Sequence, residues 1–254
     1  MARLPSATLL LGFAGWVCFL LGWHWAASAG LAPERLFPGP TAVFASLDEL
    51  LREKDFALDI WASVKRIVLS FAIAAGIALP LGLLMGASKY FDQFLAPLAG
   101  AFRYLPAPAF IPLLLMWLGT GEAQKIALLV IGVVFFLIVM IADVTKQVPN
   151  VFIETAKTLG VPRHRIVWSV IFRHSLPAYV DLFRQMLAVS WTYLVIAEIV
   201  AATDGIGAMM MRAKRFVHVD DIMAGIFVIG LLGLLFDTVF KLLHTMSFRY
   251  LNRG

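Results

Sequence analysis

Residues 154–163 read ETAKTLGVPR, and residues 175–177 further along read SLP. Phe152, Ala156 and Leu159 fall on one face of a first helix, and Val167, Val170 and Ile171 fall on one face of a second. Gly160 is the residue type that most often ends a helix, and Pro162 has the fixed φ that suits the start of the next one. The stretch therefore predicts a short helical hairpin over about residues 150–177, with an apolar face that needs a partner.

Long apolar runs flank this hairpin. The chain has 254 residues, of which 61% are hydrophobic and 15% charged, and its mean hydropathy is +0.87. Soluble domains are about half apolar and a quarter charged. A bilayer core needs about 20 apolar residues per helix, and the candidate runs are at about residues 7–28, 67–88, 94–118, 125–142, 182–203 and 222–243. We expect an all-α integral membrane protein of about six transmembrane helices, forming one transmembrane domain over residues 1–254.

Basic residues indicate the orientation, because Lys and Arg collect in cytoplasmic loops. Residues 143–177 carry five Lys or Arg against two acidic residues, whereas residues 30–59 carry six acidic residues against three basic ones. The C-terminal tail adds Arg249 and Arg253. An even number of spans places both termini on the hairpin side. We expect a multi-pass protein of the plasma membrane with both termini in the cytoplasm. Since orientation explains the net charge of +5, no nucleic-acid partner is expected.

Two basic clusters and one amphipathic segment belong to the external side in this topology. Lys65 and Arg66 fall at the outer end of the second run, and we expect them to extend to the membrane interface. Residues 211–215 read MRAKR and would face a partner outside. The turn PGPT at residues 38–41 precedes an amphipathic stretch at residues 43–51, which is expected on the outer surface.

The third apolar run contains more helix breakers than a lipid-facing rod tolerates. They are Pro97, Pro106, Pro108 and Pro112, and Arg103 lies among them. Non-helical backbone at membrane depth persists only where protein covers it or where it lines a cavity. We therefore expect this run inside the bundle.

Charged and aromatic residues within the spans are the candidates for a translocation pathway, since ionisable groups there usually face the bundle interior. The candidates are Arg103, Trp191 and Glu198, together with Pro106, which lies three residues after Arg103 in the third run. A structural alternative stays open for each. Arg103 could pair with a carboxylate or with helix-end carbonyls, and Trp191 could be a packing residue. For Asp237, a further charged residue in a span, we favour the structural role.

The hairpin resembles the coupling loop of the permease subunits of type I binding-protein-dependent ABC importers. That loop carries Glu-Ala-Ala, three further residues, Gly and a later Leu-Pro, and it docks into a cleft on the ATPase. Thr155 stands where the family has its second alanine, which is a sterically mild change. The residues that the resemblance assigns to ATPase coupling are Glu154, Thr155, Ala156, Gly160, Pro162, Arg163, Leu176 and Pro177.

Shorter matches extend the resemblance over most of the chain. They include PGP at residues 38–40, IPL at 111–113, GTGE at 119–122 and GIG at 205–207. Together they look like the branch that imports nitrate, taurine, aliphatic sulfonates or bicarbonate. The resemblance implies a homodimer, two separate ATP-binding cassette subunits that use ATP and Mg, and an external solute-binding protein.

The sequence contains no pattern that supports an enzyme. Residues 119–125 read GTGEAQK and lack the Gly-Lys-Ser/Thr of a phosphate-binding loop. One Cys and five dispersed His give no metal-binding motif. We expect no catalytic residue, metal or cofactor on this chain. The alternative function is an ion-coupled secondary transporter with Glu198 or Asp237 as its proton site, but such a protein needs no apolar cytoplasmic hairpin.

Overall fold

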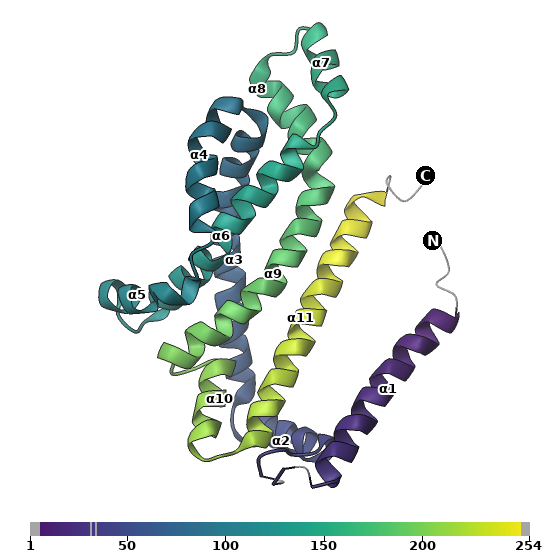
Figure 1. Ribbon diagram of the computed structural model, residues 1–254, viewed down its shortest axis with the longest axis vertical. Coiled ribbons are helices and arrows are strands. Elements are labelled where there is room, and N and C mark those ends of the chain that lie inside the picture. Colours follow the sequence, from purple (N-terminus) through teal and green to yellow (C-terminus); the bar gives the residue numbers. More distant parts are fainter. Residues whose placement is uncertain (1–5, 31, 34, 250–254) are drawn as a thin grey trace.

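The computed structural model describes residues 6–30, 32–33 and 35–249, and this part of the chain is helical without strands (Figure 1). Five helices are long and apolar enough to cross a bilayer, and one bent pair of helices would make a sixth span. The five are α1 (Ser6–Ser28), α3 (Phe56–Ala87), α6 (Glu122–Lys146), α9 (Arg173–Ala201) and α11 (Val219–Ser247). The expected all-α membrane fold is confirmed.

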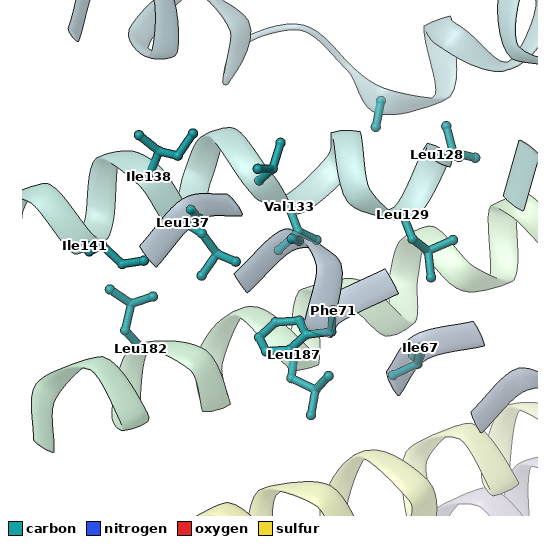
Figure 2. Packing of buried hydrophobic residues seen from close by; sticks show 14 of the residues in the cluster. Ile67, Phe71, Leu128, Leu129, Val133, Leu137, Ile138, Ile141, Leu182 and Leu187 are labelled. Carbon is teal, nitrogen blue, oxygen red and sulfur yellow. The ribbon is translucent and has the colours of Figure 1, made fainter. Parts of the chain in front are cut away.

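The core lies where α3, α6 and α9 pack together. Figure 2 shows buried side chains from these three helices meeting, among them Phe71 of α3, Leu137 and Ile141 of α6, and Leu182 of α9. Because lipid is as apolar as these residues, close packing between helices stabilises the bundle more than burial from water does. The interdigitated aliphatic side chains supply that packing.

Two glycines of α3 allow α3 and α6 to approach closely. A Cβ at Gly82 would lie 2.7 Å from the Ile138 carbonyl oxygen, and a Cβ at Gly86 would collide with Thr145. Small residues at helix contacts are typical of membrane proteins because they allow backbones to approach. This pair of helices therefore forms the closest-packed part of the bundle.

The second span begins earlier than the sequence predicts. Its apolar run suggests residues 67–88, whereas α3 starts at Phe56. The additional turns carry Asp59, Ser63 and Arg66, which are buried against other helices rather than exposed at a membrane interface. The expectation that Arg66 extends to the interface is wrong, because its charge is neutralised inside the protein. Lys65 is exposed and lies over the Trp61 ring, 6.0 Å from the centroid.

The third predicted span is broken. It consists of α4 (Lys89–Phe102), a 3₁₀ turn η1 (Ala107–Phe110) and α5 (Ile111–Leu118), with an 83° bend between the two halves. Pro106 and Pro108 lie at the break, as expected, whereas Pro97 lies inside α4. The expectation that this run lies inside the bundle holds only in part. Ala99, Ala107 and Leu114 are buried in the core, whereas Tyr104 at the break is 75% exposed and α5 projects from the side of the bundle in Figure 1.

The two ends of the bundle differ. One end carries the hairpin of α7 (Asn150–Thr158) and α8 (Arg163–Ile166), as the sequence predicts. The other end carries α2 (Pro40–Glu53) and α10 (Ile206–Arg215). In Figure 1 the first residues of α1 and the last residues of α11 both point toward the hairpin end.

A second apolar cluster fixes the end opposite the hairpin. Val43 and Leu50 of α2 pack with Met209 of α10 and Ala224 of α11. The predicted amphipathic stretch is therefore a helix that buries its apolar face on protein. Asp221 accepts a hydrogen bond of 2.7 Å from the Ser46 hydroxyl, which ties α2 to α11.

Candidate functional site

Gly160 ends the first helix of the hairpin through a specific set of hydrogen bonds. The Val161 N–H donates to the Ala156 carbonyl at 3.0 Å, and the Gly160 N–H donates to the Lys157 carbonyl at 2.9 Å. These two hydrogen bonds form a Schellman motif at the end of the helix. In this motif the residue just after the C-cap, here Gly160, adopts a left-handed conformation. Gly160 has a φ of +73°, a conformation that costs other residues about 1 to 2 kcal/mol. The glycine is therefore required by the turn itself.

The second helix starts where the sequence predicts. Pro162 precedes α8, and its carbonyl accepts the Arg165 N–H at 2.9 Å. The inner side of the hairpin packs on the bundle, because Ala156, Ile166 and Ile171 form a cluster with Leu83 of α3. Arg163 lines a cavity of about 300 Å³ at this junction. The hairpin is thus fixed to the end of α3 rather than hanging free.

The outer side of the hairpin is exposed. Glu154 and Thr155 both lie on this side, and Leu159 is 76% exposed beside Gly160. Val151 and Trp168 are also exposed large hydrophobic residues. The exposed hairpin also carries the basic residues Lys157, Arg163 and Arg165. A surface that mixes large exposed apolar side chains with charged ones at the end of a membrane bundle has the composition of a contact surface for another protein.

Leu176 and Pro177 lie at the base of the hairpin and not on its exposed surface. Leu176 is partly buried and Pro177 is buried inside α9. A six-residue π-helical segment, η2 (Val167–Phe172), comes just before α9. Two residues beyond Pro177, the buried Tyr179 hydroxyl lies 2.6 Å from the Thr145 hydroxyl of α6. The Leu-Pro pair therefore lies in the first turns of α9, next to the contact of α9 with α6.

The four predicted pathway residues fall into two groups. Arg103 and Pro106 lie at the exposed break between α4 and α5. The Arg103 guanidinium donates to the Tyr104 hydroxyl at 2.9 Å, and within the described residues it has no carboxylate in ion-pair distance. Trp191 and Glu198, both in α9, are buried within the chain. Trp191 packs on Phe236 of α11, with ring centroids 5.9 Å apart.

Glu198 belongs to an ion cluster centred on the buried Arg66, which we call the Arg66 cluster. Arg66 donates to Glu198 and to Glu122 at 2.7 Å and to Asp204 at 2.6 Å. The Ser63 hydroxyl also donates to Glu198, at 2.8 Å. Four segments of the chain thus meet at one guanidinium: α3, the start of α6, the end of α9 and the loop that follows it. Because a buried charge without a partner is costly, these contacts fix the segments relative to one another.

The Arg66 cluster also positions the start of α10. The free N–H groups of this helix are satisfied by side chains: Gly205 N–H donates to Asp59 at 2.7 Å, Ile206 N–H to Ser63 at 2.9 Å and Gly207 N–H to Glu198 at 2.8 Å. Gly205 has a φ of +107°, and a Cβ there would collide with the Glu198 carboxylate. The GIG sequence is therefore explained by close approach of backbone to carboxylate.

The same guanidinium also affects the pKa of the Asp204 carboxyl. Burial alone would raise the pKa of the Asp204 carboxyl, but the hydrogen bond from Arg66 and the positive charges of Arg66 and Lys125 outweigh burial and hold this pKa below its usual range. The carboxyl therefore stays ionised at neutral pH and keeps its bond to Arg66.

The pairing of Arg66 with buried and half-buried carboxylates was not predicted, although two signals in the sequence pointed to it. A basic residue on the side of the membrane where few basic residues are expected needs a carboxylate nearby. Asp59, Ser63 and Arg66 are also spaced four and three residues apart, so they share one face of a helix. Within the 211–215 cluster, Arg212 forms an ion pair with Asp59, whereas Lys214 and Arg215 are exposed.

The fold and the hairpin together define a class of protein, the membrane-spanning subunits of type I ABC importers. The chain resembles the solved inward-facing structure of the MetNI methionine ABC transporter, with a TM-score of 0.69 over 75% of this chain and 95% of that chain at 18% identity. Residues 78–252 match the family described as "Binding-protein-dependent transport system inner membrane component". The chain belongs to this family and is a permease subunit of an ABC importer.

Relatives of known name span nearly the whole chain. The taurine transport system permease protein TauC of Escherichia coli is 31% identical, covering 91% of this chain and 86% of TauC. The bicarbonate transport system permease protein CmpB of Synechococcus elongatus is 28% identical, with 90% and 86% covered. A putative aliphatic sulfonates transport permease of Bacillus subtilis is 28% identical, with 91% and 83% covered. These relatives favour the permease over the ion-coupled secondary transporter.

Proposed function

We propose that two copies of this chain form the membrane pathway of an importer for a small oxyanion, such as a sulfonate, taurine, nitrate or bicarbonate. Two separate ATP-binding cassette subunits bind the two hairpins and use ATP and Mg, and an external solute-binding protein delivers the solute. This chain binds neither metal nor cofactor. The hairpin and both termini face the cytoplasm of a bacterial inner membrane.

The observation that carries the coupling role is the exposed outer side of the hairpin, with its ordered turn at Gly160. Glu154 and Thr155 are available to a partner there, whereas Ala156 anchors the hairpin from below. The turn has a fixed shape because its glycine ends α7 through two backbone hydrogen bonds. A rigid and partly apolar projection can transmit a force from a partner, which a mobile loop cannot.

One continuous helix supports the mechanical link between the two ends of the protein. The 29 residues of α9 span about 43 Å at 1.5 Å per residue. Its first turns carry Pro177 and Tyr179 at the base of the hairpin, and its last turns carry Glu198 in the Arg66 cluster. Closure of the ATPase subunits on ATP would move the two hairpins together and change the tilt of α9, so that the pathway between the two copies opens outward. Hydrolysis would reset it. Such a switch needs two bundle states with different affinity for the partners.

The oxyanion assignment rests on Arg103 together with the names of the relatives. Arg103 lies in a broken span, and its contacts in the described chain are to Tyr104, so its guanidinium is open to a ligand. A guanidinium binds an oxyanion through two parallel hydrogen bonds, which an ammonium cannot reproduce. Pro106 holds the break open at the same place.

Uptake by proteoliposomes that contain the assembled transporter tests this function. We expect ATP-dependent accumulation of taurine, another sulfonate, nitrate or bicarbonate, and we expect Arg103→Lys to reduce it severalfold at unchanged protein level. Arg52→Lys is the matched control, because Arg52 is an exposed arginine paired with Asp48 in α2. Uptake restricted to a neutral or cationic solute would contradict the oxyanion assignment. Full uptake by Arg103→Lys would give Arg103 a structural role only.

A further inference from the structure

An apolar groove lies between α1 and α11 near the end of the bundle opposite the hairpin. Phe19, Gly22 and Trp23 of α1 form one wall, and Met223, Ile226 and Phe227 of α11 form the other. Figure 1 shows the two helices set apart, with α2 lying between their lower ends. Both helices are long and apolar enough to span a bilayer, so the groove lies at membrane depth. Its volume of about 610 Å³ is within the range of about 300 to 1,000 Å³ that is usual for sites of small organic ligands.

The walls of this groove are held by contacts outside it. The indole N–H of Trp23 donates to the Pro38 carbonyl at 3.1 Å, which fixes the α1 wall to the turn before α2. Phe227 packs edge-to-face on Phe44 of α2, with ring centroids 5.3 Å apart, which fixes the α11 wall to the same helix. The groove therefore keeps its shape without depending on what fills it.

Two polar cavities continue the groove toward the end of the bundle. Phe37 lines both the groove and a cavity of about 400 Å³ that also contains His24. Ala42 in turn lines this cavity and a third one of about 670 Å³, which contains Arg35 and Asp220. Because adjoining cavities share these lining residues, the path runs without a break from a carbon-lined groove to a charged end.

The two charges at this end have no partner of their own. Among the described residues, neither Arg35 nor Asp220 has an oppositely charged group at ion-pair distance. The neighbouring Asp221, by contrast, binds Ser46 and Lys54. Arg35 is exposed and Asp220 is half-buried. A guanidinium and a carboxylate that share one cavity without pairing complement a ligand that carries both a negative and a positive group.

Water and alkane each match only part of this path. Water fits the charged cavity, but apolar cavities give it no hydrogen-bond partners and stay dry. Alkane fits the groove but leaves the charges without partners. An unfilled groove would lose the dispersion contacts of its walls. The path therefore requires one molecule with a long apolar part and a zwitterionic end.

We infer that one phospholipid binds along this path, in the leaflet opposite the hairpin, with an acyl chain in the groove and a phosphoethanolamine headgroup between Arg35 and Asp220. The Arg35 guanidinium donates to the phosphate, and the primary ammonium donates to the Asp220 carboxylate. A primary ammonium has three N–H donors, whereas phosphocholine has none and phosphoglycerol offers Asp220 no cation. The lipid thereby attaches α1 to α11. The inference goes beyond the transport role and does not depend on the solute.

Lipid retention by the purified full-length chain tests the inference. The chain is stripped of lipid in detergent and then given equal amounts of three phospholipids with identical acyl chains and phosphoethanolamine, phosphocholine or phosphoglycerol headgroups. Native mass spectrometry counts each bound lipid. Gly22→Phe fills the groove, since a Cβ at Gly22 meets no atom within 4 Å. Gly76→Phe in α3 is the matched control, because Gly76 is equally open and lies outside these three cavities.

We expect the unmodified chain and Gly76→Phe to retain the phosphoethanolamine lipid at least about fivefold over the other two, because only its headgroup satisfies both charges. Gly22→Phe should lose this lipid. Arg35→Gln should lower retention of all three lipids, since an amide carries no charge for the phosphate. Asp220→Asn should remove the preference for phosphoethanolamine. Arg52→Gln, at another exposed arginine on this end of the bundle, should change nothing.

Equal retention of the three lipids by the unmodified chain would overturn the inference, because the chain would then bind bulk lipid only. A preference for phosphoglycerol would overturn it as well, and so would retention that Gly22→Phe leaves unchanged. If Gly22→Phe lowers the number of protein copies per complex while no lipid binds to the unmodified chain, a protein segment fills the groove and the inference is wrong. Arg35→Gln and Asp220→Asn change no packed side chain, so they decide the outcome even if Gly22→Phe does not fold.

Discussion

The Arg66 guanidinium in α3 lies 2.7 Å from the Glu198 carboxylate in α9, and both side chains are buried. Arg66 also binds Glu122 and Asp204. Glu198 is in turn held by Ser63 and by the Gly207 N–H. Since all of these partners come from the same chain, the arrangement supports the structural alternative for Glu198 over direct contact with solute.

Removing Arg66 should destabilise the chain more than neutralising Glu198. Arg66→Leu leaves a buried carboxylate without its cation, which costs about 3 to 5 kcal/mol. Glu198→Gln should cost less, because the amide can still bond to Ser63 and Arg66 retains two carboxylates. Thermal unfolding midpoints in detergent check the order of the two variants. Normal stability of Glu198→Gln combined with lost uptake would instead place Glu198 in the pathway.

Substitutions at Gly160 should act through backbone conformation alone. A Cβ at Gly160 would meet no atom within 4 Å in the chain, whereas φ is +73°. Gly160→Val should therefore cost about 1 to 2 kcal/mol in the turn and reduce ATPase co-purification. Gly160→Asn should be milder, because asparagine tolerates the left-handed region. Equal retention of the ATPase by Gly160→Val and by the unmodified chain would show that the turn is not part of the coupling surface.

Two glycines of α3 should differ in their tolerance of a methyl group. Gly86 packs against Thr145 of α6 with no room for a Cβ, whereas Gly76 in the same helix has open space. Gly86→Ala should destabilise the bundle by about 1 to 3 kcal/mol through overpacking. Gly76→Ala should leave the unfolding midpoint unchanged or raise it slightly, since alanine favours the helix. Similar midpoints for both variants would contradict the close packing of α3 on α6.

The orientation can be tested by labelling from outside intact cells. In a Cys18→Ser background, Asp48→Cys on α2 should react with an impermeant maleimide, and Lys157→Cys on α7 should react only after the cells are permeabilised. Both positions are exposed on their helices, so access to the reagent and not burial decides the outcome. Labelling of position 157 in intact cells would reverse the topology and remove the hairpin from the ATPase side.

Local sequence determined much of this protein. The apolar runs specify spanning helices, because a helix satisfies all of its peptide groups within one segment. Gly160 and Pro162 specify the hairpin turn, because the backbone conformations that they favour depend on residues only a few positions apart. The prolines specify that the third run breaks. These features depend on short-range backbone geometry, which can be predicted from the sequence without knowing what the segment packs against.

Tertiary structure decided which groups pair with the buried charges and in which direction the chain runs after the break in the third span. Arg66 is separated from Glu122 by 56 residues and from Glu198 by 132, and the sequence alone did not assign these partners among the available carboxylates. The sequence likewise indicates a break near Pro106 but not the direction in which α5 runs after it. Both outcomes depend on how helices distant in the chain are packed, because the cost of a buried charge or an uncovered peptide group is set by whatever lies beside it in space.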